Sequence, residues 1–196
     1  MAKLLYQGHS SIRITSDSGV VIYVDPFVGE GYDQPADIIL VTHQHYDHKR
    51  IDLPSRKSDC VVIQNWDAMK NGAYQTFSVK GVTITAFPAS NKNHKRKECV
   101  GYIIEVDGKK LYHAGDTSKI PEMRDLKSLS LDYAFLPVDG KFNMDAAEAA
   151  ECASLIGAAV SIPFHTDPEV LFDESKIEGF TVNNRKIIRP NDEFTL

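Results

Sequence analysis

The feature that most constrains this chain is a short apolar run, Ile38–Val41, which leads directly into a cluster of metal-ligand side chains. The run is rich in β-branched residues and bounded by polar ones, which predicts a buried strand. Open α/β sheets place their ligand sites at the carboxyl ends of strands, so the cluster stands where a site is expected. Imidazole and carboxylate together suit zinc, iron or manganese. The cluster consists of His43, His45, Asp47 and His48.

The spacing within this cluster favours two adjacent ions over one. His43, His45 and Asp47 occupy alternate positions, and an extended backbone would point all three toward one side. His48 breaks the alternation and can reach a neighbouring ion if a helix begins there. The alternative is that these are polar loop residues or histidines packed in a core. Four ligand-type side chains so close together after an apolar strand disfavour that alternative.

Three segments carry a resemblance to a known family. His43–His48 matches the His-x-His-x-Asp-His motif of the metallo-β-lactamase fold superfamily. Gly8–Ser11 and Tyr112–Thr117 resemble more specifically its small metal-dependent hydrolases, the relatives of L-ascorbate-6-phosphate lactonase. The resemblance runs over nearly the whole chain, and its metal motif is specific for the superfamily but says little about the substrate.

The order of strand-rich and helical segments suggests two β-sheets packed face to face with helices outside. The resemblance implies the same α/β fold (α+β in some schemes), a four-layer αβ/βα sandwich with the metals at one edge. It places a single metallo-β-lactamase-like hydrolase domain over residues 1–196. That length is ample for one buried core.

The resemblance also implies a complete ligand set for two ions. It assigns His43, His45 and His94 to one ion, and Asp47, His48 and His165 to the other, with Asp116 bridging the two. A carboxylate has two oxygens and can bridge two cations, which a histidine cannot do.

Two of these histidines lie outside the first motif. His94 stands 22 residues before Asp116 (116 − 94 = 22), and insertions are common in its loop, so a solvated loop histidine is the alternative. His165 repeats the arrangement of His43, because it follows the apolar run 160–163. His113 lies within a strand pattern and is expected to pack in the core.

Two more residues are expected to support the metal ligands or contact the substrate. The resemblance sets His9 near the metal site, and the alternative is a histidine that ties loop backbone together. Asp25 ends a strand before Pro26, and in the resembled family an aspartate here supports the metal-binding loop from behind. Metal-bound histidines normally donate their other ring N–H to such a partner. The alternative for Asp25 is a simple turn residue.

The segment 92–97 is basic. Such a run is usually a solvated surface, but if His94 reaches the metal, these cations must lie near the site and would attract an anionic substrate. Lys95 and Arg96 are therefore candidate substrate contacts. The four cations of the segment are Lys92, Lys95, Arg96 and Lys97.

Charge and composition bound the partners and the compartment. The net charge of −5 (22 − 27) disfavours nucleic-acid binding, and no apolar run is long enough for a signal peptide or a membrane span. Three widely spaced cysteines predict free thiols in a reducing compartment, so we expect a cytoplasmic protein. The expected partner is a small, anionic molecule rather than nucleic acid or a membrane, and homo-oligomerisation is left open.

Local patterns predict several elements away from the site. Residues 66–71 are expected to form a short helix closed by Gly72. Asp145 is expected to cap a helix that runs to Ile156, with Glu148 as the reciprocal residue of a capping box. Residues 173–196 are expected to form a helix or loop and a closing strand pair.

Together these residues predict a binuclear metallohydrolase that uses a metal-bound hydroxide on a small anionic ester, lactone or phosphodiester. The expected cofactors are two divalent ions, zinc first and manganese or iron as alternatives. Such ions lower the pKa of bound water from about 15.7 toward neutrality and polarise the attacked oxygen. Asp47 is the candidate catalytic residue, because it could orient the nucleophile or accept its proton.

Three other functions remain as alternatives. A ribonuclease Z-like nuclease or phosphodiesterase is disfavoured by the acidic chain, and a di-iron oxidoreductase by the lack of a flavin-binding domain. A non-catalytic metal- or ligand-sensing module is disfavoured by the complete ligand set, although fold alone does not decide function. Asp116 stands where many β-lactamases of the superfamily have cysteine, which disfavours β-lactam hydrolysis.

Overall fold

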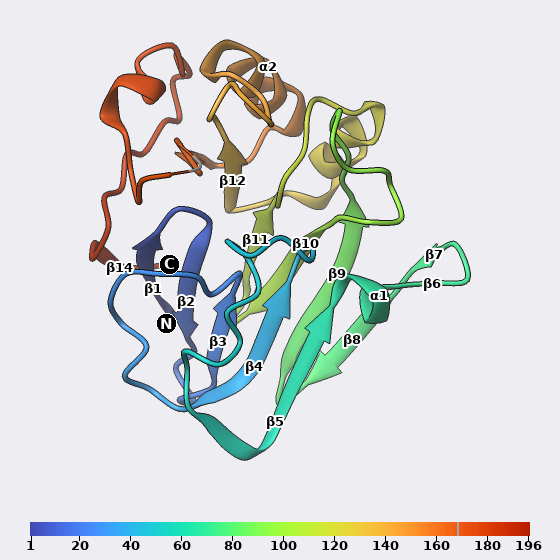
Figure 1. The fold of residues 1–196 in the computed structure, drawn as a ribbon, viewed down its shortest axis with the longest axis vertical. Helices are drawn as coiled ribbons and strands as arrows, with labels where there is room; N and C mark the ends of the chain where they lie inside the picture. The colour runs from blue at the N-terminus through green and yellow to red at the C-terminus, as the bar shows by residue number, and fades with distance from the viewer. Residues whose placement is uncertain (168) are drawn as a thin grey trace.

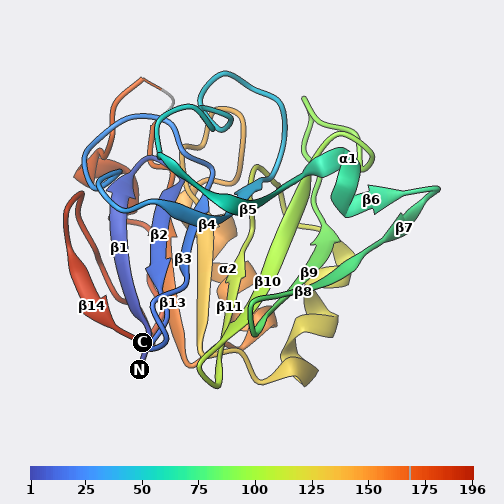
Figure 2. The same ribbon diagram turned by 90° about the horizontal axis from the view of Figure 1, so that it is seen from below.

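Two six-stranded β-sheets lie face to face in the structure, a computed structural model that describes residues 1–167 and 169–196 (Figures 1 and 2). The first sheet has the strand order β14-β1-β2-β3-β4-β5. Its strands are β1 (Lys3–Gly8), β2 (Ser11–Thr15), β3 (Val21–Val24), β4 (Ala36–Val41), β5 (Arg56–Gln64) and β14 (Glu193–Thr195).

The second sheet has the strand order β13-β12-β11-β10-β9-β8. The turn between β10 and β11 is made by Asp107 and Gly108, whose positive φ angles of 48° and 76° suit a tight hairpin. Its strands are β8 (Thr76–Val79), β9 (Val82–Pro88), β10 (Val100–Val106), β11 (Lys109–His113), β12 (Tyr133–Pro137) and β13 (Val160–Phe164).

Each sheet contains a parallel part that delivers strand ends to the site. Strands β3, β4 and β5 run parallel to one another, and so do β11, β12 and β13. Because the carboxyl ends of parallel strands meet at the same edge of a sheet, the loops that follow them lie together.

The main core lies between the sheets. Side chains alternate along the strands, so Ile22 and Ile38 point into this core while Tyr23 and Ile39 point to the outer face of the first sheet. The second sheet is covered on its outer face by the helix α2 (Ala146–Ile156) and the 3₁₀ helices η1 (Pro121–Leu129) and η2 (Glu174–Ile177), whose buried residues share one cluster.

The predicted fold class is confirmed, with one difference in its outer layers. Helices cover the second sheet, but the outer face of the first sheet is covered by loop residues that include Tyr32 and Ile51. In Figure 2 these loops pass over β4 and β5 on the side opposite α2. No helix in the described residues is both long and apolar enough to cross a membrane.

The expected helix over 66–71 is wrong in its second half. The helix α1 covers only Asn65–Ala68, and the chain continues into a small hairpin of β6 (Met69–Lys70) and β7 (Ala73–Tyr74). Asn71 and Gly72, with φ angles of 52° and 79°, form the turn of that hairpin. An Asn-Gly pair is a strong hairpin signal, and here it prevails over the interpretation of Gly72 as a helix end.

Two other local expectations are confirmed only in part. Asp145 caps α2 by accepting a hydrogen bond from the Glu148 backbone N–H at 2.8 Å, but the Glu148 carboxylate instead accepts one from the backbone N–H of Lys119 at 3.0 Å. In the C-terminal segment the structure has one strand, β14, rather than a strand pair, and it joins the first sheet beside β1.

Candidate metal centre

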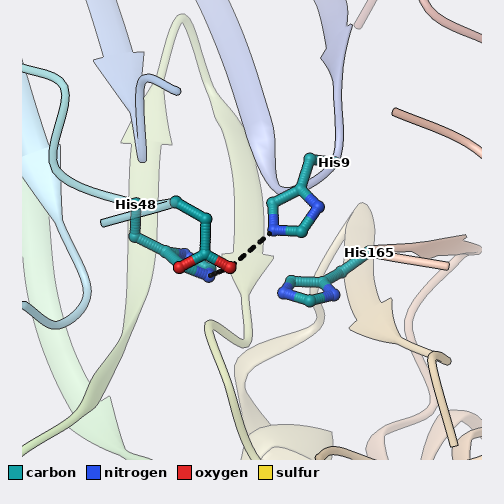
Figure 3. A group of neighbouring side chains, drawn as sticks. His9, His48 and His165 are labelled. Atoms are coloured by element: carbon teal, nitrogen blue, oxygen red, sulfur yellow. Dashed lines mark hydrogen bonds and ion pairs between the residues drawn. The ribbon is translucent and has the colours of Figure 1, made fainter. Parts of the chain in front are cut away.

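The sequence-predicted ligands come together at the edge of the sandwich where the parallel strands end. The segment 43–48 follows β4, His94 lies in the loop between β9 and β10, and Asp116 and His165 follow β11 and β13. His9 reaches the same place from the turn between β1 and β2. Figure 3 shows the rings of His9, His48 and His165 arriving from three different elements.

The first group of donors consists of His43, His45 and His94. Their nearest ligand atoms all lie within 4.8 Å of one another, and the Nε2 atoms of His45 and His94 are 3.1 Å apart. His94 is only 6% exposed, which argues against the alternative of a solvated loop histidine. Three imidazoles at this spacing suit one divalent ion.

The second group consists of His9, Asp47, His48 and His165, again with ligand atoms within 4.8 Å of one another. It contains the three residues assigned to a second ion from the sequence, and it adds His9. All four are buried. One aspartate with three buried imidazoles is a typical ligand set for a transition metal.

Asp116 lies between the two groups. Its Oδ1 atom is 3.4 Å from His48 Nε2 and 3.3 Å from His165 Nε2, and its Oδ2 atom is 3.8 Å from His43 Nε2. Gly115, with a φ of 62°, allows the sharp approach, because a Cβ there would be 2.8 Å from the Val100 carbonyl oxygen. Each carboxylate oxygen therefore faces a different group.

Asp25, which follows β3, supports ligands of both groups. Its carboxylate accepts hydrogen bonds from His48 Nδ1 at 2.8 Å and from the backbone N–H and the hydroxyl of Thr42, both at 2.7 Å. The Thr42 hydroxyl lies 3.0 Å from His43 Nδ1. Since that hydroxyl donates to Asp25, it accepts from His43, which leaves the Nε2 lone pair of His43 free for a metal.

Asp139, which follows β12, was not singled out from the sequence. Its Oδ1 atom accepts hydrogen bonds from the backbone N–H groups of Lys141, Phe142 and Asn143 at 2.7, 2.6 and 3.2 Å. Its Oδ2 atom lies 3.5 Å from His165 Nδ1. The available signal was an aspartate directly after a buried strand, the same position that Asp25 occupies after β3.

The electrostatics of the cluster favour a cation. Burial lowers the pKa of His43 and His48 well below the usual value, that of His165 to about 3, and that of His94 to about 4. These rings are therefore neutral and offer lone pairs.

Several of the donor atoms are buried and have no partner among the described residues. They include the Nε2 atoms of His43, His48 and His165, and one oxygen each of Asp47 and Asp116. Lone pairs that face one another in a buried place are costly unless a proton or a cation lies between them. The donor set therefore fits divalent metal ions.

His9 takes part in both of the roles considered for it. Its Nε2 atom is 3.2 Å from Asp47 Oδ2 and its ring centroid is 3.9 Å from that of His165, so it belongs to the cluster. Its Nδ1 atom lies 3.1 Å from the Asp167 carbonyl oxygen, so the same ring also ties loop backbone together. His9, Asp25 and His165 all have left-handed backbone conformations, with φ of 55°, 46° and 45°. Such strained positions concentrate at functional sites.

Other predicted residues lie away from the donors. His113 packs in the core, as expected, with its Nε2 atom 2.8 Å from the Ser10 carbonyl oxygen. Arg96 pairs with Glu122 and neither it nor Lys95 lines the cavity beside the donors, so their proposed contact with substrate lacks support. The pair forms because the loop lies against η1, which the sequence pattern did not reveal.

A cavity of about 430 Å³ opens beside the donors of both groups. The residues that line it are His45, Tyr46, Asp47, Asn93, His94, Asp116, Lys141, Phe142, His165 and Glu169.

Comparison with known proteins agrees with this geometry. Residues 3–165 match the family described as "Beta-lactamase superfamily domain". The chain belongs to this superfamily. It is 30% identical to a UPF0173 metal-dependent hydrolase of Thermococcus onnurineus, with 96% of each chain covered. It is 33% identical to another from Alkaliphilus metalliredigens, with 83% of this chain and 84% of the relative covered.

A solved structure adds to this similarity. This is the crystal structure of a protein from Parabacteroides distasonis that is assigned as a metal-dependent hydrolase. Its TM-score to this chain is 0.78 and its sequence identity is 31%, and the match covers 93% of this chain and 90% of the other. The chain is thus a metal-dependent hydrolase of the metallo-β-lactamase fold with a His/Asp metal site. The likeness to L-ascorbate-6-phosphate lactonase stays a prediction.

Proposed function

We propose that this protein is a binuclear metallohydrolase that acts on a small anionic ester, lactone or phosphodiester. The observation that carries the proposal is the position of Asp116, whose two oxygens face two separate groups of donors. A site built for one ion would not need a carboxylate between two complete groups. The family membership supports the hydrolytic reaction, and the donor chemistry supports zinc, with manganese or iron as alternatives.

The proposed ligands follow the two groups. His43, His45 and His94 would hold one ion, Asp47, His48 and His165 the other, and Asp116 would contact both. Two divalent ions in such a site supply an activated water near neutral pH and a Lewis acid for the attacked oxygen.

The chain's own residues would prepare this chemistry. Asp25 holds the Nδ1–H of His48, and through Thr42 that of His43, so both rings present Nε2 to the ions. All the proposed ligands except the exposed His45 are buried, and burial strengthens the electrostatic interactions among them. Asp47 has one buried oxygen without a partner in the described residues, and this is the atom that could orient the nucleophile or accept its proton.

Metal removal and restoration test the proposal. Protein purified without chelator should contain two divalent ions per chain and should hydrolyse a member of a panel of small anionic esters, lactones and phosphodiesters. Activity should disappear after dialysis against chelator and should return with zinc or manganese. Equal turnover by the metal-free protein would contradict the proposal, and so would a maximum of one bound ion per active chain.

We also propose a cytoplasmic location and no nucleic-acid partner. The free thiols of Cys60, Cys99 and Cys152 support a reducing compartment. Fractionation of the native host would test the location. A shift in the gel mobility of RNA or DNA when the protein is added at physiological salt would contradict the absence of a nucleic-acid partner.

A further inference from the structure

The cavity beside the metal donors has one wall that the hydrolytic function alone does not explain. We propose that this wall, formed by Tyr46 and Phe142 with Lys141 at its rim, selects an anionic substrate that carries a flat aromatic ring. The inference rests on the proposed function, since it places the charged, reacting group of the substrate at the donors and the ring against the wall.

The side chains of Tyr46 and Phe142 are exposed to solvent rather than packed in the core. Tyr46 is 67% exposed and Phe142 is 38% exposed, and both line the same cavity from different loops. Two further exposed apolar residues, Val28 and Val170, follow Phe27, which packs against Tyr46, and Glu169, which lines the cavity. Apolar side chains that gather around a cavity, rather than scatter singly, mark a binding site.

The ring of Tyr46 and the loop that carries Phe142 are held in position. The ring of Phe27 packs edge-on against Tyr46, with centroids 5.7 Å apart and planes at 81°. The backbone N–H of Phe142 is bound by Asp139, the residue that also lies beside His165. A positioned ring binds another ring with less loss of side-chain entropy than a mobile one.

Among the described residues that line this cavity, Lys141 supplies the cation. It lines the cavity, and its Nζ atom is 5.1 Å from the centroid of the Phe142 ring and 4.0 Å from Glu169 Oε1. The side chain is 58% exposed, so this ion pair is weak and can exchange for a substrate anion. Arg96, in contrast, is bound by Glu122 outside the cavity.

The size of the cavity sets the scale of the substrate. A volume of about 430 Å³ lies near the lower end of ligand pockets and holds one ring with an ester, lactone or phosphoryl group. A polymer would have to extend well beyond it. The alternative occupant, a protein that docks on the exposed aromatic residues, would not need the metal ions.

Binding of phosphonates to the zinc-loaded protein tests the inference without requiring turnover. Phenylphosphonate and methylphosphonate share the anion and differ by the ring, and cyclohexylphosphonate separates a flat ring from apolar bulk. Calorimetric titration should show that phenylphosphonate binds about tenfold more tightly than methylphosphonate, with the cyclohexyl compound between them. Zinc content is measured for every preparation.

Variants locate the effect. Tyr46→Leu and Phe142→Leu should each reduce the phenyl-to-methyl ratio several-fold, while Trp66→Leu, an exposed aromatic residue that does not line the cavity, should leave it unchanged. Lys141→Gln should weaken both phosphonates by about threefold, as expected for one partly exposed charge, and Lys92→Gln should weaken neither.

The outcomes separate the two proposals. Zinc-dependent binding of both phosphonates with equal affinity, or equal effects of Trp66→Leu and Phe142→Leu, would overturn the aromatic pocket and leave the metallohydrolase intact. Equally tight binding of phenylphosphonate to the metal-free protein would overturn the inference, because the anion would then not lie at the metal ions. Two bound zinc ions with no binding of either phosphonate would also overturn the inference. Failure of the hydrolase proposal is recognised separately, when the protein does not bind two divalent ions of zinc, manganese or iron.

Discussion

Asp25 and Asp139 occupy equivalent places in the two sheets but bind different partners. Each is buried and follows a strand of the parallel part of its sheet, and each lies behind a histidine of the metal cluster. Asp25 directs its hydrogen bonds to Thr42 and His48, at the end of β4 and in the loop after it. Asp139 directs most of its own to backbone N–H groups of the loop 141–143, and it only approaches His165.

The difference shows that the two sheets contribute differently to the site. The first sheet presents metal ligands on a rigid support, because Asp25 orients rings of both donor groups. The second sheet connects a metal ligand to the wall of the cavity, because Asp139 lies beside His165 and holds the loop that carries Phe142. Loss of Asp25 should therefore affect the metal, whereas loss of Asp139 should also affect the substrate.

The largest effect is expected at Asp116, which lies between the two donor groups. Asp116→Ala removes the carboxylate that faces both groups, so bound metal should fall below two ions per chain. The loss of kcat/KM should exceed the roughly 10–100-fold that is typical for residues that only support ligands. Metal analysis and steady-state kinetics on the same preparation would measure both. If Asp116→Ala retained two ions and unchanged kinetics, the two donor groups would bind their ions independently of this carboxylate.

Asp25→Ala should give the next largest effect, on metal affinity. Without its carboxylate the rings of His43 and His48 lose their orientation, and affinity should fall about 10–100-fold. Leaving the buried Thr42 N–H unpaired should also destabilise the metal-free protein by about 1–3 kcal/mol. Chelator competition and urea unfolding would measure the two effects. KM should change little once metal is saturating, and a large rise in KM would break the distinction between the two aspartates.

Asp139→Ala should produce a mixed and smaller effect. Release of the loop 141–143 should raise KM by about tenfold, the order expected when one positioned wall of a pocket is lost. Metal affinity should fall less than in Asp25→Ala, since the contact with His165 is long. Kinetics at saturating metal would separate the effects. If metal affinity fell as far as in Asp25→Ala while KM stayed constant, both aspartates would serve the metal alone.

Asp37 provides the smallest effect and a control, since it is a buried carboxylate that binds lysines instead of histidines. Lys57 and Lys80 lie 2.7 and 2.6 Å from its oxygens. Burial alone would raise its pKa, but hydrogen bonds from these lysines prevail and lower it. A lowered pKa in the folded state contributes stability above the unfolded value near 3.8, and that stability is lost as the pH falls through the folded value.

Asp37→Asn should therefore lower the Tm at pH 7 and leave metal content and kcat/KM unchanged. The difference in Tm between wild type and variant should shrink as the pH falls from 5 to 3. Thermal unfolding across this range would measure it. A difference that stayed constant or grew on acidification would show that the charge of Asp37 does not stabilise the fold.

The parts of the site that could be predicted from the sequence are local. His43–His48 are consecutive residues at the end of an apolar strand, so their shared position follows from the strand itself. The fold class followed from the family motif and the order of elements. Asp25 could be inferred because it ends a strand before Pro26, where the resembled family has an aspartate that supports the metal-binding loop.

The rest depends on contacts between distant parts of the chain. Asp139 follows an apolar strand as Asp25 does, but its contact with His165 becomes visible only when β12 and β13 place the two residues side by side. Arg96 was a candidate substrate contact until η1 brought Glu122 to it, 26 residues away. The aromatic wall could not be predicted either, because Tyr46 and Phe142 belong to loops of different sheets.

Anomalous diffraction from crystals grown with zinc or manganese tests most directly whether two ions share this site. We predict two peaks per chain, with His43, His45 and His94 about 2.0–2.1 Å from one and His48 and His165 at that distance from the other, and Asp116 in contact with both. A single peak, or two peaks of which neither contacts Asp116, would contradict the binuclear site.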